Sequence, residues 1–369
     1  MALSAELKPK QFNSNWEEKM GKKGICYIVV GAQYGDEGKG KVSAVLTLRH
    51  DIPNAVRCGV GPNAGHGVWY EGGGISGEIE GRHIPCGFVN ARTTLFIAPG
   101  TLIDPEVLET ELNVLEKFGV EARKRVKIDS RCPVIEERHR IAEGRGSYLH
   151  TAIGSMGSGC GNLNAERALR DSKVRFARDI ESLRPYVIDD VSLLLIEELN
   201  AGKSLLVEGT QGFGLSLVHG QYPYVTSKDT TASQFLADAG IPPSFPVRVY
   251  ACMKPYTTRA GTGPLKGEND PSLAHITERE VRPNVVIGEK RRIGLFDKDL
   301  VRRALVVNGA TDIALTNIDR MWPEDYGKTT MDKLSLDARR FIDELEEEFH
   351  IPVTLISTGP RLEHVIFKE

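Results

Sequence analysis

Short apolar runs recur along the chain and alternate with longer segments in which apolar residues return at helical spacing. A short apolar run bounded by turn residues predicts a buried strand, and the longer spacing predicts an amphipathic helix. The predicted strands cover residues 25–30, 55–58, 94–98, 126–128, 133–135, 205–208, 246–253, 312–316 and, as the last strand, 353–357. The predicted helices cover residues 42–48, 104–118, 163–170, 179–199, 297–307 and 336–349.

This alternation predicts an α/β fold whose central sheet is mostly parallel and is covered by helices on both faces. The sequence contains no internal repeat and no linker, so we expect a single domain over residues 25–369. Residues 1–24 are polar and lack the apolar core of a signal peptide, and we interpret them as an N-terminal extension.

The amino-acid composition limits the kinds of function that we expect for this protein. The net charge of −3 gives no general attraction to nucleic acid or to membranes. No apolar run is long enough to span a bilayer. The six cysteines form no CxxC pair, which is typical of reduced thiols rather than of a disulfide framework or a zinc site. We therefore expect a cytoplasmic protein that binds neither nucleic acid nor a membrane.

The stretch from Gly31 to Lys41, GAQYGDEGKGK, lies between a predicted strand and a predicted helix. This arrangement points backbone N–H groups and a helix N-terminus at a phosphate. Unlike the common loop GxxxxGK[ST], it carries Asp36 and Glu37 internally and has Gly40 after Lys39. The pattern indicates a phosphate loop with a built-in acid or base. The alternative is a glycine-rich turn with solvated charges.

Other glycine-rich stretches also follow predicted strands. They are GVGPNAGHG at residues 59–67, GTQGFG at residues 209–214 and STGP at residues 357–360. A further stretch over residues 138–161 ends in AIGSMGSGCG, and residues 71–81 predict a hairpin or a mobile loop. Because ligands of open parallel sheets bind at the carboxyl ends of the strands, we expect the loops after Val30, Arg57, Glu208 and Ser357 to form one site.

Four features occur in a fixed order: GDEGKGK at residues 35–41, PNAGHG at residues 62–67, VEGTQGFGLSL with HGQYPYVTS over residues 207–227, and STGP at residues 357–360. In this order, over nearly the whole chain after residue 24, they closely resemble the adenylosuccinate synthetase family. The length and the SGCG segment at residues 158–161 are most similar to its compact archaeal-type branch. The resemblance implies a P-loop-like nucleotide-binding architecture and a carbon–nitrogen ligase.

That family joins L-aspartate to C6 of a 6-oxopurine 5′-monophosphate, with GTP as the donor (ATP stays open here) and Mg²⁺ as the cofactor. The resemblance implies that Asp36 takes the N1 proton, that O6 then attacks the γ-phosphate, and that the amine of aspartate displaces the phosphate from C6. It implies that His66 donates a hydrogen bond or a proton to O6 and that Lys39 neutralises the phosphates. Mg²⁺ would be held by the Asp36 carboxylate and the Gly65 carbonyl.

The other site residues are carried over from the family's motifs to the matching positions. The nucleotide substrate would contact Asn63, Gln211, Thr226, Ser155, Met156 and Arg170, the last of which reaches the neighbouring subunit's site and so implies a homodimer. L-Aspartate would contact Val286, Ile287, Gly288, Arg291 and Arg292. The nucleoside triphosphate would contact Gly35, Glu37, Gly38, Gly40, Lys41, Gly65, Gly67, Asn317, Asp319, Ser357, Thr358 and Gly359.

The chain departs from the family's pattern at several of these positions. Glu289 replaces an arginine that touches both the ribose 2′-hydroxyl and aspartate, and Ile287 replaces a threonine that holds the aspartate carboxylate. Loss of the 2′-hydroxyl contact makes a 2′-deoxynucleotide more acceptable, so we favour dGMP as the substrate. The other departures are Ser155 and Met156 for two threonines, Gly67 for Thr or Ser, and Asn317 for a lysine.

Use of dGMP is a property of a phage-encoded branch of the family. That branch makes the 2-amino-2′-deoxy analogue of adenylosuccinate for diaminopurine DNA, and its enzymes act in the host cytoplasm. It often replaces the loop aspartate with serine, whereas Asp36 is present here, so IMP is the alternative substrate. Two further hypotheses are a regulatory NTPase built on the same loop and an inactive homologue, the latter motivated by Ile287 and Glu289.

Overall fold

The computed structural model describes residues 23–277 and 291–368. Most of the predicted N-terminal extension lies outside these ranges. The same holds for three residues predicted to bind aspartate, Val286, Ile287 and Gly288, and for Glu289.

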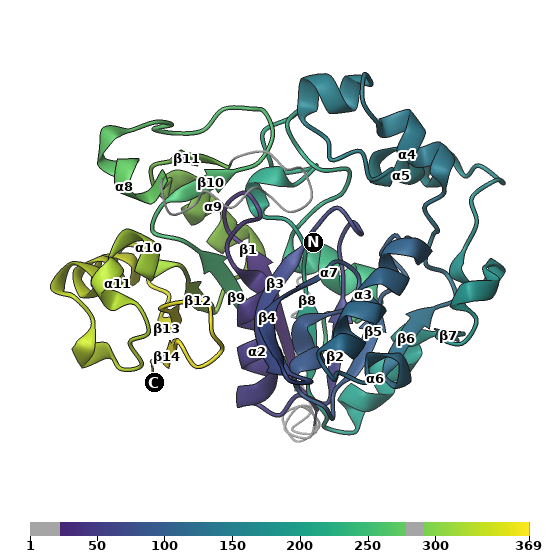
Figure 1. Cartoon of the computed structure of the whole chain (residues 1–369), viewed down its shortest axis with the longest axis horizontal. Helices are drawn as coiled ribbons and strands as arrows, with labels where there is room; N and C mark the ends of the chain where they lie inside the picture. The colour runs from purple at the N-terminus through teal and green to yellow at the C-terminus, as the bar shows by residue number, and fades with distance from the viewer. Residues whose placement is uncertain (1–22, 278–290, 369) are drawn as a thin grey trace, which may run out of the picture.

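A 10-stranded sheet forms the centre of the molecule, in the order β14-β13-β12-β9-β1-β8-β2-β5-β6-β7 (Figure 1). All neighbouring strands pair in parallel except β13 and β14 at one edge, which confirms the predicted, mostly parallel sheet. Its strands are β1 Cys26–Gly31, β2 Asn54–Arg57, β5 Thr94–Ile97, β6 Val126–Asp129, β7 Val187–Ile188, β8 Leu205–Glu208, β9 Val247–Met253, β12 Asp312–Leu315, β13 Val353–Ser357 and β14 Val365–Phe367.

Both faces of the sheet are buried, which explains why its strands are continuous apolar runs. Alternate residues of β1 enter different clusters: Ile28 and Val30 join one, and Tyr27 and Val29 join the other. Helices α6, α7, α9 and α11 contribute to the first cluster and α2 to the second. The helices are α2 Lys39–Arg49, α3 Pro105–Lys117, α4 Glu137–Glu143, α5 Cys160–Leu169, α6 Val191–Asn200, α7 Ala232–Ala239, α8 Ala274–Thr277, α9 Lys298–Asn308, α10 Ile318–Met321 and α11 Leu336–Phe349.

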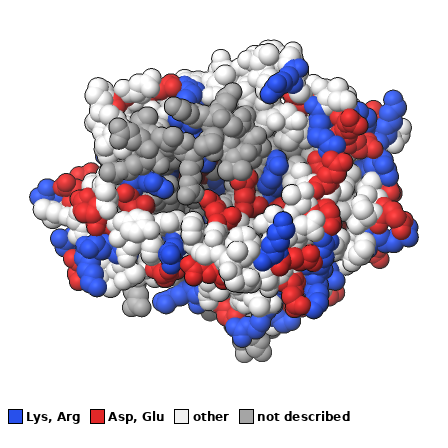
Figure 2. Space-filling view, viewed as in Figure 1, with Lys and Arg blue, Asp and Glu red and all other residues white. Residues whose placement is uncertain are grey.

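Two small antiparallel pairs lie outside the main sheet. Strands β3 His66–Gly72 and β4 Ile75–Gly81 form the hairpin that the sequence predicted as one of two possibilities for residues 71–81. Strands β10 Thr257–Arg259 and β11 Arg292–Gly294 form the other pair. Basic and acidic side chains are interspersed over the face shown in Figure 2, as the small net charge suggests. Among the described helices, none is long and apolar enough to cross a bilayer.

The carboxyl ends of the parallel strands gather the loops that the sequence singled out. The loop after β1 leads into α2, which begins at Lys39 and therefore places Lys39 and Lys41 in its first turn. Gly38 precedes the helix in a left-handed conformation with φ of 73°, which glycine adopts without strain. Strands β2 and β8 are neighbours, and their last residues, Arg57 and Glu208, are directly paired in register.

Three sequence predictions are wrong. Residues 179–199 do not form one helix, because Pro185 cannot continue a helix. Two 3₁₀ turns precede Pro185, the short strand β7 follows it, and α6 begins only at Val191. Residues 133–135 form only isolated bridges rather than a strand. The strand at residues 353–357 is not the last, since β14 follows it.

The start of α6 can be tested at its N-cap. The Asp190 side chain accepts a hydrogen bond from the Leu193 N–H, so Asp190→Ala should lower the free energy of unfolding by about 0.5–2 kcal/mol. Asp190→Ser, which keeps a cap, should stay close to wild type in urea unfolding. Inside a continuous helix over residues 179–199, alanine would stabilise relative to aspartate, and that result would contradict the observed boundary.

Candidate active site

Two cavities open at the carboxyl edge of the sheet. The larger has a volume of about 410 Å³ and the smaller about 210 Å³. They have one wall in common, which is made by residues of the phosphate loop, of the loop before β3, of β3 and β4, and of the segment before β11. The residues that line both cavities are Gly35, Asp36, Gly65, His66, Gly67, Glu78 and Arg291.

The phosphate loop is held by a carboxylate at its centre. Glu37 is buried and accepts hydrogen bonds from the N–H groups of Gln33 at 3.0 Å and Gly35 at 2.7 Å. It also pairs with the Lys39 ammonium at 2.7 Å, and Lys39 donates to the Gly35 carbonyl at 2.7 Å. Lys39 lines the smaller cavity, whereas Glu37 lines neither. Glu37 therefore shapes the loop from behind.

Asp36 lies in the common wall and faces the basic side chain of Arg291. The distance from Arg291 Nε to Asp36 Oδ2 is 3.0 Å. This pair joins a predicted proton acceptor to a residue predicted to hold the carboxylate of aspartate. The pair therefore engages two of the groups that the sequence analysis expects to act on substrates.

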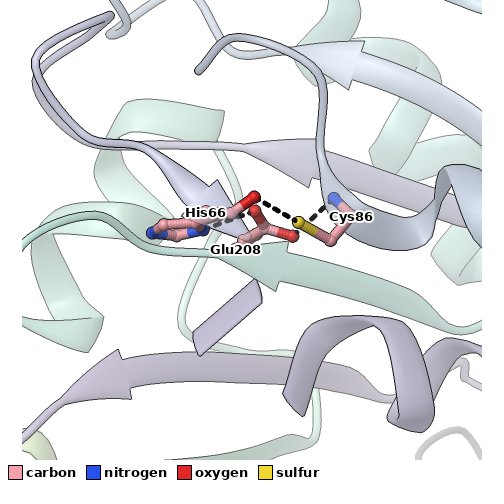
Figure 3. A group of neighbouring side chains, drawn as sticks. All are labelled: His66, Cys86 and Glu208. Atoms are coloured by element: carbon pink, nitrogen blue, oxygen red, sulfur yellow. Dashed lines mark hydrogen bonds and ion pairs between the residues drawn. The ribbon is translucent and has the colours of Figure 1, made fainter. Parts of the chain in front are cut away.

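His66 contacts a buried network of polar and charged groups, of which Figure 3 shows Glu208 and Cys86. Its Nδ1 lies 2.7 Å from Glu208 Oε1 and 2.6 Å from Arg57 Nη1. Arg57 and Glu208 form an ion pair in which both side chains are fully buried. Glu208 Oε2 accepts a further hydrogen bond from the Cys86 N–H at 2.8 Å. The imidazole is thereby fixed at Nδ1. His66 lines both cavities, and its buried Nε2 has no partner among the described residues.

The network sets the charges of its members. Burial and the Arg57 charge lower the pKa of His66 to about 3, so the imidazole is neutral near pH 7. Burial opposes ionisation of Glu208, but its bond to His66 and the charge of Arg57 outweigh burial and lower the pKa of this carboxyl. The site thus holds an ionised carboxylate beneath a neutral imidazole, which can accept a second proton when negative charge enters the cavity.

The side chains of His66, Cys86 and Glu208 come close enough to hold a metal ion. Two observations favour a hydrogen-bonded network instead. The Arg57 cation already neutralises Glu208. Burial raises the pKa of the Cys86 thiol well above its ordinary value, so the sulfur keeps its proton, whereas a metal ligand must lose it.

The larger cavity contains most of the residues predicted to bind the nucleotide substrate: Asn63, Gln211, Thr226, Ser155 and Met156. Gln211 Nε2 donates to Asn63 Oδ1 at 3.0 Å, which links the loops after β2 and β8. The Ser155 hydroxyl donates to Glu143 Oε1 at 2.7 Å. Arg170 lies elsewhere, exposed at the C-terminus of α5.

The smaller cavity contains most residues predicted to bind the nucleoside triphosphate. Lys41 crosses to the loop after β13, where its ammonium donates to Ser357 Oγ at 2.9 Å and to the carbonyls of Gly359 and His364 at 2.7 Å each. Burial lowers the pKa of Lys41 to about 7, against the opposing charges of Asp319 and Glu363. The other predicted residues that line this cavity are Gly35, Gly38, Gly40, Gly65, Gly67, Asn317 and Asp319.

Two further predicted residues point away from the cavities. The Thr358 side chain is buried and donates to the Lys328 carbonyl at 2.7 Å. Arg292 pairs with Glu268 and donates to the carbonyls of Gly261 at 3.1 Å and Gly263 at 2.8 Å. Arg292 therefore fixes a neighbouring loop, and Arg291 is the described arginine that reaches the common wall.

Sequence reasoning missed several residues of the site. Arg57 and Glu208 could have been noticed, because each is a charged residue at the end of an otherwise apolar strand. Arg259 is buried against the Tyr34 ring at 4.4 Å and donates to the Tyr224 carbonyl at 2.9 Å, which supports the wall around Thr226. Glu78 and Glu80 gave no signal, because the hairpin sequence is glycine-rich and polar throughout.

Known proteins are similar to this chain in sequence and in fold. The family model for adenylosuccinate synthetase matches residues 28–178 and 174–325. The adenylosuccinate synthetase of Pyrococcus horikoshii is 46% identical over 340 residues, which cover 92% of this chain and 97% of the relative. That of Methanocaldococcus jannaschii is 44% identical over 346 residues, with 92% and 96% covered.

Two solved structures have the same fold at low identity. The fully ligated adenylosuccinate synthetase from Plasmodium falciparum superposes with a TM-score of 0.82 at 20% identity, covering 93% of this chain and 99% of that one. The succinoaminodeoxyadenylate synthetase of cyanophage S-2L, bound to dGMP and dATP, superposes with a TM-score of 0.73 at 24% identity, covering 94% and 95%.

The fold and the sequence define a carbon–nitrogen ligase. The chain belongs to the adenylosuccinate synthetase family, in its compact archaeal-type branch.

The buried network under His66 predicts that a single substitution, Glu208→Gln, strongly lowers the stability of the fold. Glu208→Gln removes one charge and leaves Arg57 buried without its counter-ion, so the free energy of unfolding should fall by about 3–5 kcal/mol. Glu121→Gln, which breaks an exposed pair with Lys124, should have no measurable effect in the same urea unfolding experiment. Equal stabilities of wild type and Glu208→Gln would contradict the network.

The lowered pKa of Lys41 predicts that the free energy of unfolding depends on pH. Its pKa is about 7 in the folded protein, whereas the ordinary value for an exposed lysine is 10.5, so above pH 7 the unfolded chain binds the extra proton. The free energy of unfolding should then rise with pH, by at most about 1.4 kcal/mol per pH unit from this group. Lys41→Met should lack this contribution between about pH 7 and 8.5. Parallel stability curves for the two proteins would show that Lys41 does not titrate there.

Proposed function

We propose that the protein joins L-aspartate to C6 of IMP and converts GTP to GDP and phosphate in the same cycle, forming adenylosuccinate. The observation that carries this proposal is the wall common to the two cavities. It contains Asp36 and His66, so a purine in the larger cavity and a triphosphate in the smaller would meet at both side chains. The identity of 44–46% to archaeal adenylosuccinate synthetases supports the same reaction.

The residues of the wall suit a two-step reaction. Asp36 would accept the N1 proton of the purine, so that O6 carries the negative charge with which it attacks the γ-phosphate. His66 would take up a second proton at Nε2 as negative charge develops and would then donate from Nε2 to O6 and to the transferring phosphoryl group, while Glu208 stabilises the proton held at Nδ1. Lys39, in the first turn of α2, would neutralise the phosphates. The amine of aspartate would then attack C6 and expel the phosphate.

The wall also fits Mg²⁺, which we propose as the cofactor. Asp36 offers a carboxylate and Gly65 a backbone carbonyl, and both are oxygen donors of the kind that Mg²⁺ prefers. Asp36 Oδ2 has only the Arg291 ion pair among the described residues, so the cation would take the place of that guanidinium. Bound Mg²⁺ would supply positive charge beside the phosphate oxygens.

We propose IMP rather than dGMP as the natural substrate. The expectation of dGMP rests on Glu289, which lies outside the described residues. The phage enzyme that binds dGMP shares only the fold with this chain, at 24% identity, whereas the relatives at 44–46% identity are adenylosuccinate synthetases. The same relatives argue against a regulatory NTPase and against an inactive homologue.

We further propose a homodimer in which Arg170 completes the partner's site. Arg170 is exposed at the end of α5 with φ of 59° and lies outside both cavities of its own chain. The left-handed conformation turns the chain sharply at this residue, which leaves the guanidinium available to a second subunit.

Wild-type enzyme should release phosphate from GTP only when both IMP and L-aspartate are present, with turnover of IMP far above that of dGMP. Asp36→Asn removes the proton acceptor and should lower turnover by about 10²–10⁴-fold at unchanged thermal stability. Asp337→Asn, at an exposed position of α11, is the matched control and should keep full activity.

Three results would contradict this account. Dominant dGMP turnover would reassign the substrate, and phosphate release without purine or aspartate would indicate an NTPase. Full activity of Asp36→Asn would remove Asp36 from the reaction. The proposed homodimer is tested by sedimentation velocity of the same preparation. At micromolar protein concentration, the dimer should be more abundant than the monomer.

A further inference from the structure

The β3–β4 hairpin carries two carboxylates that the reaction described above does not use. Glu78 and Glu80 alternate with buried Ile79 along β4, so both project to the same side of the hairpin. Glu80 lines the larger cavity and Glu78 lines both cavities. Both residues therefore belong to the region where the purine, the phosphate and aspartate must meet.

The carboxylates lie directly over the glycines on either side of His66. A Cβ added to Gly65 would lie 2.1 Å from Glu80 Oε1, and a Cβ added to Gly67 would lie 2.3 Å from Glu78 Oε1. The absence of a side chain at Gly67 leaves the room that the Glu78 carboxylate occupies.

The charge of Glu80 is not neutralised by an ion pair with any residue in the described ranges. The nearby basic groups have other partners: Arg82 Nε donates to the Pro62 carbonyl at 2.6 Å, and Arg291 pairs with Asp36. A half-buried carboxylate without a counter-ion favours a cationic ligand.

A second observation also indicates a ligand at this place. His66, which lies between the two glycines in the sequence, is only 4% exposed and lines the same cavity. Its buried Nε2 has no hydrogen-bond partner in the part of the chain that the structure describes. A ligand that fills the space beside His66 Nε2 would therefore lie next to the Glu80 carboxylate.

We propose that Glu80, assisted by Glu78, binds the α-ammonium group of L-aspartate. This inference rests on the proposed function, because that reaction brings an amino acid to C6 of the purine beside His66. The ammonium is a second cation that must approach this wall, besides the Mg²⁺ proposed at Asp36 and Gly65. Arg291 on the same wall offers positive charge to the carboxylates of aspartate. The zwitterion would thus be oriented with its amine toward Glu80 and C6.

The arrangement explains selectivity for an amino acid over a simple dicarboxylate. Arginine alone would bind succinate, which carries the same two carboxylates but no ammonium, as readily as aspartate. A carboxylate placed at the ammonium position pairs with aspartate. Succinate has no positive group to pair with this carboxylate, so it binds less well. Glu80 is therefore a specificity-determining residue for the second substrate.

Steady-state kinetics of Glu80→Gln test the proposal. The substitution keeps the shape of the side chain and removes its charge, so KM for L-aspartate should rise about tenfold or more. The KM values for IMP and GTP should change by less than about twofold, and the inhibition constant of succinate should stay the same or fall. Glu78→Gln should raise KM for aspartate by a smaller factor. Glu71→Gln, on the same hairpin but more than half exposed, is the control and should match wild type.

Three outcomes would overturn the proposal. The first is an unchanged KM for aspartate in Glu80→Gln, and the second is an equal shift of aspartate and succinate, which would indicate a general disturbance of the site. The third is a raised requirement for Mg²⁺ with KM for aspartate unchanged at saturating metal, which would assign Glu80 to the cation. Failure of the proposed function is distinct, because wild-type enzyme would then form no product from IMP and aspartate.

Discussion

The carboxylate of Glu208 lies between the guanidinium of Arg57 and the imidazole of His66, and all three side chains are buried. A buried charge is tolerated only where it is paired and hydrogen-bonded, so these residues must keep their places together. Parallel pairing of β2 with β8 puts Arg57 and Glu208 opposite each other, and His66 follows in the first position of β3. The sheet register therefore fixes where His66 Nε2 faces the cavities.

From this fixed imidazole the rest of the site follows. The phosphate loop after β1 brings Asp36 to the same wall, and Glu37 keeps that loop in shape from behind. Lys41 ties the start of α2 to the loop after β13, so two sides of the smaller cavity are joined by one ammonium group. The common wall is thus built from rigid elements, which suits a reaction that depends on the position of two substrates.

The strands and the carboxyl-edge loops could be predicted from the sequence, because buried parallel strands are continuous apolar runs and their ends carry glycine-rich turns. The pairing of Arg57 with Glu208 could not, since it depends on which strands become neighbours across 151 positions. The helix predicted over residues 179–199 does not form because the segment contains Pro185, which has no N–H to donate, even though its apolar residues have helical spacing. Glu80 could not be predicted either, because its place in the larger cavity beside Gly65 depends on how the β3–β4 hairpin folds back on itself.

The central claim is that O6 of the purine, and not water, attacks the γ-phosphate at the wall that holds Asp36 and His66. The most direct test is turnover of IMP labelled with ¹⁸O at position 6, followed by mass spectrometry of the phosphate released. The account predicts one ¹⁸O atom in each phosphate, because the purine oxygen leaves as part of it. Unlabelled phosphate, with its new oxygen derived from the solvent, would contradict the account.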